Sequence, residues 1–144
     1  MRILIDTNIL LDFLACRQPY FASADKIIGY CKNGILSGAV AAHSIPNVFY
    51  ILRKSYSPNE LRAMLRWLCA LTKIVGIDEE TIERALDDKD FTDFEDCLQK
   101  ECAAAFQADY IVTRDAQDFK HSAIPWISPD SFCRLMESMY PTDK

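Results

Sequence analysis

Short apolar runs alternate with segments of helical periodicity along the whole chain. The first run, Ile3–Ile5, starts almost at the first residue and is followed by Asp6, Thr7 and Asn8. It is apolar at every position rather than at every second one, which predicts a strand covered on both faces, as in a parallel sheet between helices. Ligands bind beyond the carboxyl ends of such strands, where Asp6 lies, although Asp6 or Thr7 could also serve only to cap the next helix.

Four more apolar runs predict the other strands, and segments with helical spacing fill the intervals between them. We expect these strands at residues 35–42, 73–77, 110–113 and 125–127. The expected helices cover residues 8–16, 23–32, 44–54, 57–71, 78–86, 93–107 and 128–136. Strands that alternate with helices along the chain indicate an α/β fold with a mainly parallel sheet.

Capping patterns predict where several of these helices begin. Ser57-Pro58 and Ser128-Pro129 each place a capping hydroxyl before a proline at the first helical position. Thr92 and Glu95 have the spacing of a capping box, which predicts a helix that begins at Asp93.

The composition is that of a globular protein of ordinary domain size. The chain has 144 residues, of which half are hydrophobic and a quarter are charged. We expect one domain over residues 1–140 and a frayed end at 141–144. No apolar run approaches the roughly 18 residues of a membrane span, and Asp6 interrupts any leader-like segment, so we expect a cytoplasmic protein with no membrane partner.

Charge is distributed unevenly along the chain. Residues 78–96 hold ten acidic and two basic residues, so this segment carries −8 and the remainder +3 within a net charge of −5. The net charge argues against a nucleic-acid partner, but its concentration in one segment weakens that objection. A solvated helix face, with Ile82, Ala85 and Leu86 turned inward, would account for the acidic run. A metal site or a surface for a basic partner are the alternatives.

A second strand ends in acidic residues in the same way as the first. Tyr110–Thr113 is followed by Arg114 and Asp115, and then by Asp118. If this strand is a neighbour of Ile3–Ile5, the two backbones lie ~4.8 Å apart and their acids emerge at the same edge of the sheet. Two carboxylates would then share one cleft.

The helix that begins near Asp93 can bring further acids to the same place. Asp93 and Asp96 are three residues apart, so they lie on one face of its first turn. The helix dipole alone would also explain acids at this position. Clustered carboxylates repel one another unless a cation neutralises them, and oxygen ligands without thiolate or imidazole suit Mg²⁺ or Mn²⁺.

Such a metal site favours hydrolysis of a phosphodiester, because the metal polarises a phosphate oxygen and activates a bound water. Arg114, next to the acids in sequence, is the candidate for phosphate contact. His43 lies at a strand end, and we interpret it as structural rather than catalytic.

Three motifs in this order resemble the PIN-domain family: Asp6-Thr7-Asn8, Asp93-Phe94-Glu95-Asp96, and Thr113-Arg114-Asp115 with Asp118-Phe119. The resemblance covers nearly the whole chain. It implies a three-layer α/β/α sandwich with a mainly parallel sheet of four to five strands. Many bacterial members are metal-dependent endoribonuclease toxins held in check by an antitoxin. The resemblance therefore implies an RNA substrate, a small antitoxin partner and a homodimer.

The resemblance also implies which acids act. Asp6, Asp96 and Asp115 correspond to the acids that bind Mg²⁺ or Mn²⁺ and carry catalysis in the family. Asp93 and Asp118 correspond to supporting acids that also face the metal.

Four neutral residues would support these acids. Thr7, Asn8 and Thr113 would orient carboxylates or water through hydrogen bonds. Many family members carry a glutamate on the helix after the second strand, and Asn47 stands at the matching position. An amide oxygen can bind a metal without adding negative charge, but asparagine is equally common as an ordinary residue near a helix start.

Two functions from different classes remain open at this point. The first is a Mg²⁺- or Mn²⁺-dependent endoribonuclease that serves as the toxin of a toxin–antitoxin pair. The alternative is a non-catalytic PIN-like module that binds RNA or a protein, which Asn47 and the acidic balance favour. A small-molecule phosphatase or an aspartyl-phosphate protein ranks last, because no DxD pattern follows the first strand.

Overall fold

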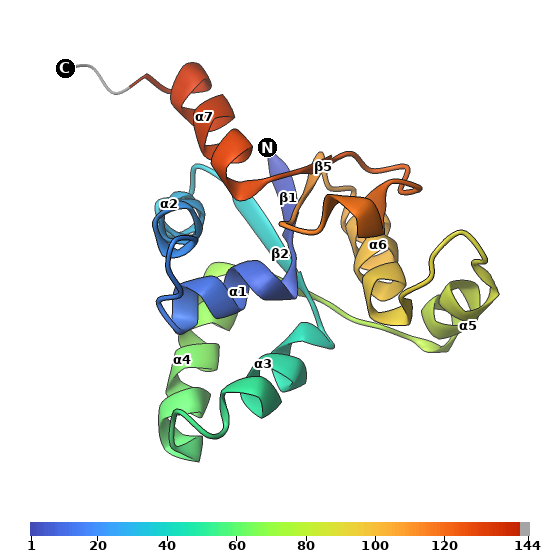
Figure 1. Ribbon diagram of the computed structural model, residues 1–144, viewed down its shortest axis with the longest axis horizontal. Coiled ribbons are helices and arrows are strands. Elements are labelled where there is room, and N and C mark those ends of the chain that lie inside the picture. Colours follow the sequence, from blue (N-terminus) through green and yellow to red (C-terminus); the bar gives the residue numbers. More distant parts are fainter. Residues whose placement is uncertain (142–144) are drawn as a thin grey trace.

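The computed structural model describes residues 1–141 as strands alternating with helices around one sheet (Figure 1). The strands are β1 (Arg2–Ile5), β2 (Ser37–Ala41), β3 (Lys73–Val75), β4 (Tyr110–Val112) and β5 (Trp126–Ile127). The helices are α1 (Thr7–Leu14), α2 (Phe21–Lys32), α3 (Ser44–Leu52), α4 (Pro58–Leu71), α5 (Glu79–Asp87), α6 (Phe94–Phe106) and α7 (Pro129–Met139), with a 3-10 helix, η1 (Ala116–Phe119).

The five strands form one parallel sheet in the order β3-β2-β1-β4-β5. The register pairs Ile3 with Tyr110 and Ile5 with Val112, so β1 lies in the centre with β4 directly beside it. The residues that follow β1 and β4 therefore emerge next to each other at the carboxyl edge of the sheet. This arrangement confirms the predicted α/β fold with a parallel sheet.

Both faces of the sheet are covered, as the unbroken apolar run of β1 predicts. Ile3 and Ile5 pack on one side against α1, α2, α3, α4 and α7. Leu4 points to the other side and packs against Cys102 and Ala103 of α6. Figure 1 shows α5 and α6 on one side of the sheet and the larger group of helices on the other. The molecule is thus built in three layers.

The start of α6 differs from the prediction in a way that matters for function. Asp93, not Thr92, caps this helix, and its carboxylate accepts the backbone N–H of Asp96 at 3.0 Å. The capping box expected between Thr92 and Glu95 is therefore wrong. Because Glu95 does not fold back onto the helix start, its side chain is free to make other contacts.

Two other expectations about the helices also need correction. Leu86 does not face the core: it is 67% exposed, whereas Ala85 beside it is buried. The 3-10 helix η1 has no counterpart among the predicted elements, because the apolar spacing of residues 116–119 is too short to show a helical period.

Residues 142–144, which include most of the end expected to fray, lie outside the described residues. The expected extent of one domain over 1–140 stays a prediction. Within residues 1–141, no helix combines the length and the apolar character that a membrane crossing requires.

Candidate metal centre

A pocket of about 270 Å³ opens at the carboxyl edge of the sheet, and we call it the acid pocket. Five of its lining residues are the acids named from the sequence, and three more are the predicted supporting residues Thr7, Asn8 and Asn47. The full lining consists of Asp6, Thr7, Asn8, Leu11, Asn47, Ile51, Asp93, Glu95, Asp96, Asp115 and Asp118. The fold thus brings together residues from α1, α3, α6 and η1.

Asp6 both caps a helix and lines the acid pocket. Its carboxylate accepts the backbone N–H of Thr7 at 2.8 Å and the hydroxyl of Thr113 at 2.8 Å. Its own backbone N–H donates to the carbonyl of Val112 at 3.1 Å, which continues the pairing of β1 with β4. Only 2% of Asp6 is exposed. Asp6 therefore caps α1 and lines the acid pocket at the same time, so these two roles are not alternatives.

Asp115 is held from two sides. Its backbone N–H donates to the hydroxyl oxygen of Thr113 at 2.9 Å, and its carboxylate accepts Nδ2 of Asn8 at 2.6 Å. The same Thr113 hydroxyl donates to Asp6. Thr113 therefore joins the two acids that follow neighbouring strands, although it does not itself line the pocket.

The first turn of α6 supplies the other side of the pocket. Asp93, Glu95 and Asp96 each place one carboxylate oxygen so that the three oxygens lie within 4.8 Å of one another. This spacing suits a shared cation, and the ligands are all oxygen, as Mg²⁺ and Mn²⁺ prefer. The donor set of the pocket therefore fits a hard divalent ion.

Glu95 lines the acid pocket, whereas its spacing from Thr92 predicted only a role in capping α6. Its Oε1 accepts the hydroxyl of Thr7 at 3.2 Å and Nε2 of Gln99 at 3.2 Å, and it lies 3.1 Å from Nε2 of His43. His43, interpreted above as structural, thus contacts a pocket acid directly. The signal that could have indicated this group is the spacing of Glu95 and Gln99, four residues apart on one helix face.

Gln99 lies at the back of this group, fully buried. Its Nε2 lies 2.9 Å from the hydroxyl of Thr7 and 2.8 Å from that of Ser44, and these two hydroxyls share a hydrogen bond of 2.8 Å. The amide nitrogen therefore contacts both hydroxyls, while Oε1 of Gln99 is buried without a partner among the described residues. The network therefore ties α6 to the starts of α1 and α3 behind the acid pocket.

The pKa values of two pocket acids, Asp6 and Asp96, are raised. Burial raises the pKa of Asp6 to about 6, and the nearby carboxylates of Glu95 and Asp115 add to this. Burial also raises the pKa of Asp96 to about 8, with further contributions from Asp6, Asp93, Glu95 and Asp118. The hydrogen bond from His43 instead holds the pKa of Glu95 below its usual value. A cation would offset both the burial and the repulsion that raise the pKa values of Asp6 and Asp96.

Arg114 does not line the acid pocket, and the phosphate contact predicted for it stays a prediction. Its Nε and Nη2 donate to the carboxylate of Asp12 at 2.8 and 3.2 Å, and its guanidinium lies 3.9 Å from the centre of the Tyr20 ring. Asp12 is fully buried on α1, so it requires a counter-charge. Arg114 therefore packs against Asp12 of α1 and against Tyr20, which precedes α2.

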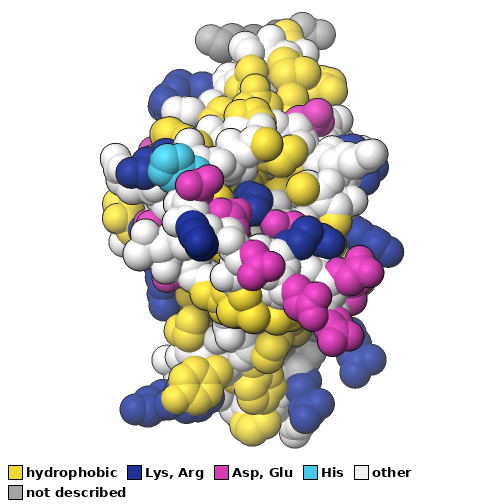
Figure 2. All heavy atoms as spheres, turned by 90° about the vertical axis from the view of Figure 1, so that its right-hand side faces the viewer, with side chains coloured by type: hydrophobic (Ala, Val, Ile, Leu, Met, Phe, Trp, Pro, Cys, Tyr) yellow, Lys and Arg dark blue, Asp and Glu magenta, His cyan; other side chains and the backbone are white. Residues whose placement is uncertain are grey.

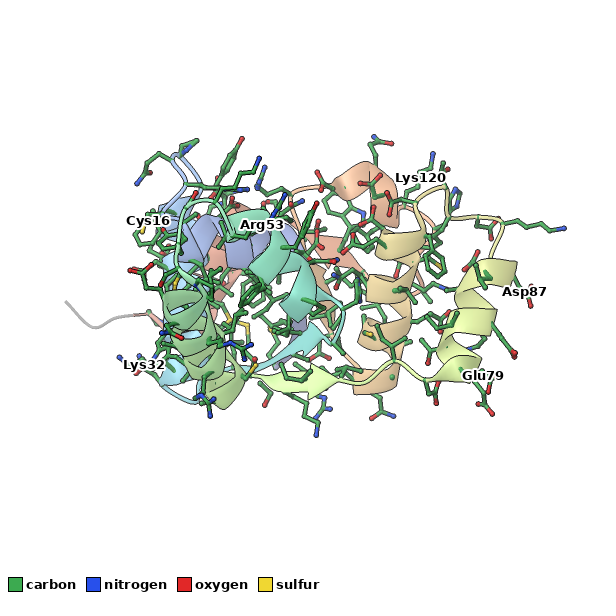
Figure 3. The ribbon with its side chains drawn as sticks, turned by 90° about the horizontal axis from the view of Figure 1, so that it is seen from below. Cys16, Lys32, Arg53, Glu79, Asp87 and Lys120 are labelled. Atoms are coloured by element: carbon green, nitrogen blue, oxygen red, sulfur yellow. The ribbon has the colours of Figure 1, made fainter. Side chains whose placement is uncertain are left out.

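The acidic run divides into two parts with different surroundings. Figure 2 shows a group of acidic side chains standing out from one face of the molecule, and Figure 3 shows Glu79 and Asp87 at the outer side of α5. Glu79, Glu80, Glu83 and Asp87 are exposed there, as a solvated helix face requires. Asp93, Glu95 and Asp96 line the acid pocket. The solvated-face interpretation therefore holds for α5, and the metal-site interpretation concerns only the start of α6.

Fold and site together define an α/β protein with a parallel sheet and a carboxylate-lined pocket at the sheet's carboxyl edge. The sequence matches the PIN domain over residues 2–117. The chain therefore belongs to the PIN-domain family, which confirms the resemblance read from the three motifs. No curated protein matches the sequence.

Solved structures with the same fold come from toxin–antitoxin complexes. A chain of VapBC2 from Rickettsia felis, bound to a DNA fragment from their promoter, has a TM-score of 0.62 and 18% identity, covering 89% of this chain and 98% of that one. A chain of a toxin–antitoxin complex from Klebsiella pneumoniae has a TM-score of 0.66 and 20% identity, covering 88% and 97%. At these identities the likeness shows the fold that the chains share.

Proposed function

We propose that this protein is a divalent-metal-dependent endoribonuclease and the toxin of a toxin–antitoxin pair. The observation that carries the proposal is the meeting of Asp6, Asp96 and Asp115 in one pocket, although they lie far apart in the chain. Membership of the PIN-domain family supports the same conclusion, and so does the occurrence of the fold in two toxin–antitoxin complexes.

Asp6, Asp96 and Asp115 would hold Mg²⁺ or Mn²⁺, with Asp93 and Asp118 close by. A bound divalent ion supplies charge for a phosphate oxygen and lowers the pKa of a water. RNA phosphates would be repelled by the acid pocket alone, so the pocket's own charge argues that substrate and cation bind together.

The chain's own residues prepare the carboxylates for this task. Thr113 holds Asp6 through its hydroxyl and Asp115 through the backbone, and Asn8 fixes the second oxygen of Asp115. The Asp96 carboxyl, with its raised pKa, must lose a proton before its oxygens can bind a cation. Glu95 stays ionised beside it because His43 stabilises its charge.

Two partners belong to the same proposal. A toxin of this kind is expected to bind a small antitoxin protein and to form a homodimer. Exposed apolar side chains that could take part in such contacts include Tyr50 and Ile51 on α3, and Ile51 also lines the acid pocket. An antitoxin that covered this part of α3 would also restrict access to the acids.

A non-catalytic PIN module that binds RNA or protein is the second candidate, and Asn47 is the observation that favours it. Asn47 lines the acid pocket with a neutral amide. A carboxylate at the same position would bind a cation more tightly, so the amide favours a module with weaker metal binding.

The test is cleavage of fluorescently labelled single-stranded RNA by the purified protein in EDTA, Mg²⁺ or Mn²⁺. We expect cleavage only with a metal, and a loss of at least about 100-fold in Asp6→Asn and in Asp96→Asn. Asp87→Asn, which removes the same charge from the exposed face of α5, serves as the matched control and should retain activity.

Circular dichroism would verify that the variants are folded. Equal cleavage by the wild type and both pocket variants, or cleavage undiminished by EDTA, would contradict the proposal. Tight binding of RNA without cleavage in any metal would favour the non-catalytic module instead.

A further inference from the structure

A second pocket, which we call the Tyr20 pocket, has a mainly apolar lining with a few polar groups. Its volume is about 280 Å³, and it is lined by Tyr20, Ser23, Arg114, Ser128, Pro129 and Asp130. These residues come from the starts of α2 and α7 and from the segment after β4. The function proposed above makes no use of this pocket.

Two adjacent contacts connect the Tyr20 pocket to the acid pocket. Asn8 binds Asp115, which lines the acid pocket, and Asp12 binds Arg114, which lines the Tyr20 pocket. Asn8 and Asp12 are four residues apart on α1, which corresponds to ~6 Å along the helix axis. Arg114 and Asp115, which line the two pockets, are also consecutive residues, so the pockets are neighbours and one RNA strand could reach both.

The hydrogen-bonding groups of the Tyr20 pocket are held in place. Arg114 uses Nε and Nη2 for the buried Asp12, and no hydrogen bond within residues 1–141 involves its Nη1. Asp130 accepts the hydroxyl of Ser23 through Oδ1, while its Oδ2 has no hydrogen-bond partner among the described residues. The pocket thus offers a fixed donor on one side and a fixed acceptor on another.

Tyr20 supports the side chain of Arg114. Its side chain is 43% exposed, and the Arg114 guanidinium lies over its ring. This cation–π contact adds to the hold of Asp12 on the guanidinium, so the position of Arg114 is fixed by two partners. A phosphate is a poorer occupant, because the charge of Arg114 is offset by Asp12 and Asp130 brings a further negative charge to the rim.

We propose that the Tyr20 pocket binds the base of the nucleotide next to the scissile phosphate and that it prefers guanine. The proposal rests on the nuclease function proposed above. The base-pairing edge of guanine carries the acceptor O6 beside two donors, N1–H and N2–H. Arg114 can donate to O6, and the Asp130 carboxylate can accept from both donors. Adenine offers one donor group and cytosine one, so neither satisfies the carboxylate in this way.

Cleavage of designed RNAs tests this preference. The substrates are uridine oligonucleotides in which one position holds guanosine, inosine, adenosine or cytidine, and inosine lacks only the N2 amino group of guanosine. We expect the guanosine substrate to have a kcat/KM about tenfold above the others in Mg²⁺. Asp130→Asn should reduce this ratio about tenfold, and Tyr20→Ala should weaken guanosine selection mainly through KM.

Asp25→Asn is the matched control, because Asp25 is exposed on α2 and lies outside both pockets. It removes the same charge as Asp130→Asn and should leave the guanosine preference unchanged. Cleavage without base preference, a preference for another base, or a guanosine preference that survives in Asp130→Asn would each overturn the proposal while the nuclease function stands.

Binding of mononucleotides separates this proposal from the nuclease function. Saturation-transfer NMR in EDTA would compare 5′-GMP with 5′-IMP and 5′-AMP. We expect the strongest transfer to 5′-GMP and its loss in Asp130→Asn. If the wild type cleaves no RNA in any metal, the proposed function fails, and 5′-GMP binding alone then decides for or against the pocket. Equal transfer to all three mononucleotides would overturn the proposal.

Discussion

Nδ2 of Asn8 lies 2.6 Å from Oδ2 of Asp115, and this contact joins the first turn of α1 to the segment that follows β4. It fixes one oxygen of Asp115 while the other stays available to the acid pocket. We expect Asn8→Ala to lower kcat of metal-dependent RNA cleavage about tenfold, because partners of this kind orient a ligand without binding the metal themselves. Steady-state kinetics at saturating Mg²⁺ would measure the effect.

Asn59→Ala provides the control for this substitution. Asn59 is exposed on α4 and lies outside the acid pocket, so the same change of side chain there should leave kcat unaltered. An unchanged kcat in Asn8→Ala would show that Asp115 needs no help from Asn8.

A second prediction concerns stability and pH in the metal-free protein. The pKa of Asp6 is raised to about 6 and that of Asp96 to about 8, both above the ordinary value of 3.8. The folded state therefore binds more protons than the unfolded state between about pH 4 and pH 8, and the free energy of unfolding falls as pH rises through this window. We expect Asp96→Asn, which carries no charge at this position, to be more stable than the wild type by about 1–3 kcal/mol at pH 8.5.

Urea unfolding in EDTA at pH 4.0 and pH 8.5 would measure this difference. The advantage of Asp96→Asn should be small at pH 4.0, where the wild-type carboxyl holds its proton. Excess Mn²⁺ at pH 8.5 should stabilise the wild type more than the variant. A variant that is less stable than the wild type at pH 8.5 in EDTA would show that Asp96 is not strained.

The sequence was informative where local pattern decides the structure. The unbroken apolar run of β1 predicted a strand buried on both faces, and the acids after β1 and β4 were expected at one edge if these strands were neighbours. The register of Ile5 with Val112 meets that condition. The order of the three motifs along the chain also indicates the PIN-domain family, to which the chain belongs.

The sequence was less informative where contacts between distant residues determine the position of a side chain. Glu95 has the spacing of a capping residue, but the contact with His43, 52 positions earlier, determines where its side chain lies. Arg114 stands beside an acid in sequence, yet the buried Asp12 on α1 attracts its guanidinium. For both Glu95 and Arg114, the position of the side chain is determined by a residue distant in sequence, which a local sequence pattern does not reveal.

The pair formed by Asp12 and Arg114 provides a third prediction. Because Asp12 is fully buried, removing its partner leaves a charge without compensation, and we expect Arg114→Ala to destabilise the protein by about 3 kcal/mol. Asp12→Asn removes that charge, so Asp12→Asn/Arg114→Ala should be less destabilised than the sum of the two single variants. Urea unfolding of all four proteins completes the cycle. Additive losses would show that the two side chains do not depend on each other.

The last prediction concerns the charge that Asn47 does not supply. Asn47 and Glu95 both line the acid pocket, from α3 and α6, and Glu95 is the acid whose pKa is lowered. Glu95→Gln should therefore weaken Mn²⁺ binding about tenfold, and Asn47→Glu should strengthen it. The double variant restores the number of carboxylates and should bind Mn²⁺ with nearly wild-type affinity.

Titration of Mn²⁺ by electron paramagnetic resonance measures these affinities without any cleavage assay. Glu83→Gln, on the exposed face of α5, makes the same chemical change outside the pocket and should not alter Mn²⁺ binding. If Glu95→Gln binds Mn²⁺ as tightly as the wild type, Glu95 serves only to anchor the network of His43 and Gln99. If Asn47→Glu binds Mn²⁺ more weakly than the wild type does, the amide of Asn47 is a better ligand at this position than a carboxylate. An additional negative charge in the acid pocket would then not favour metal binding.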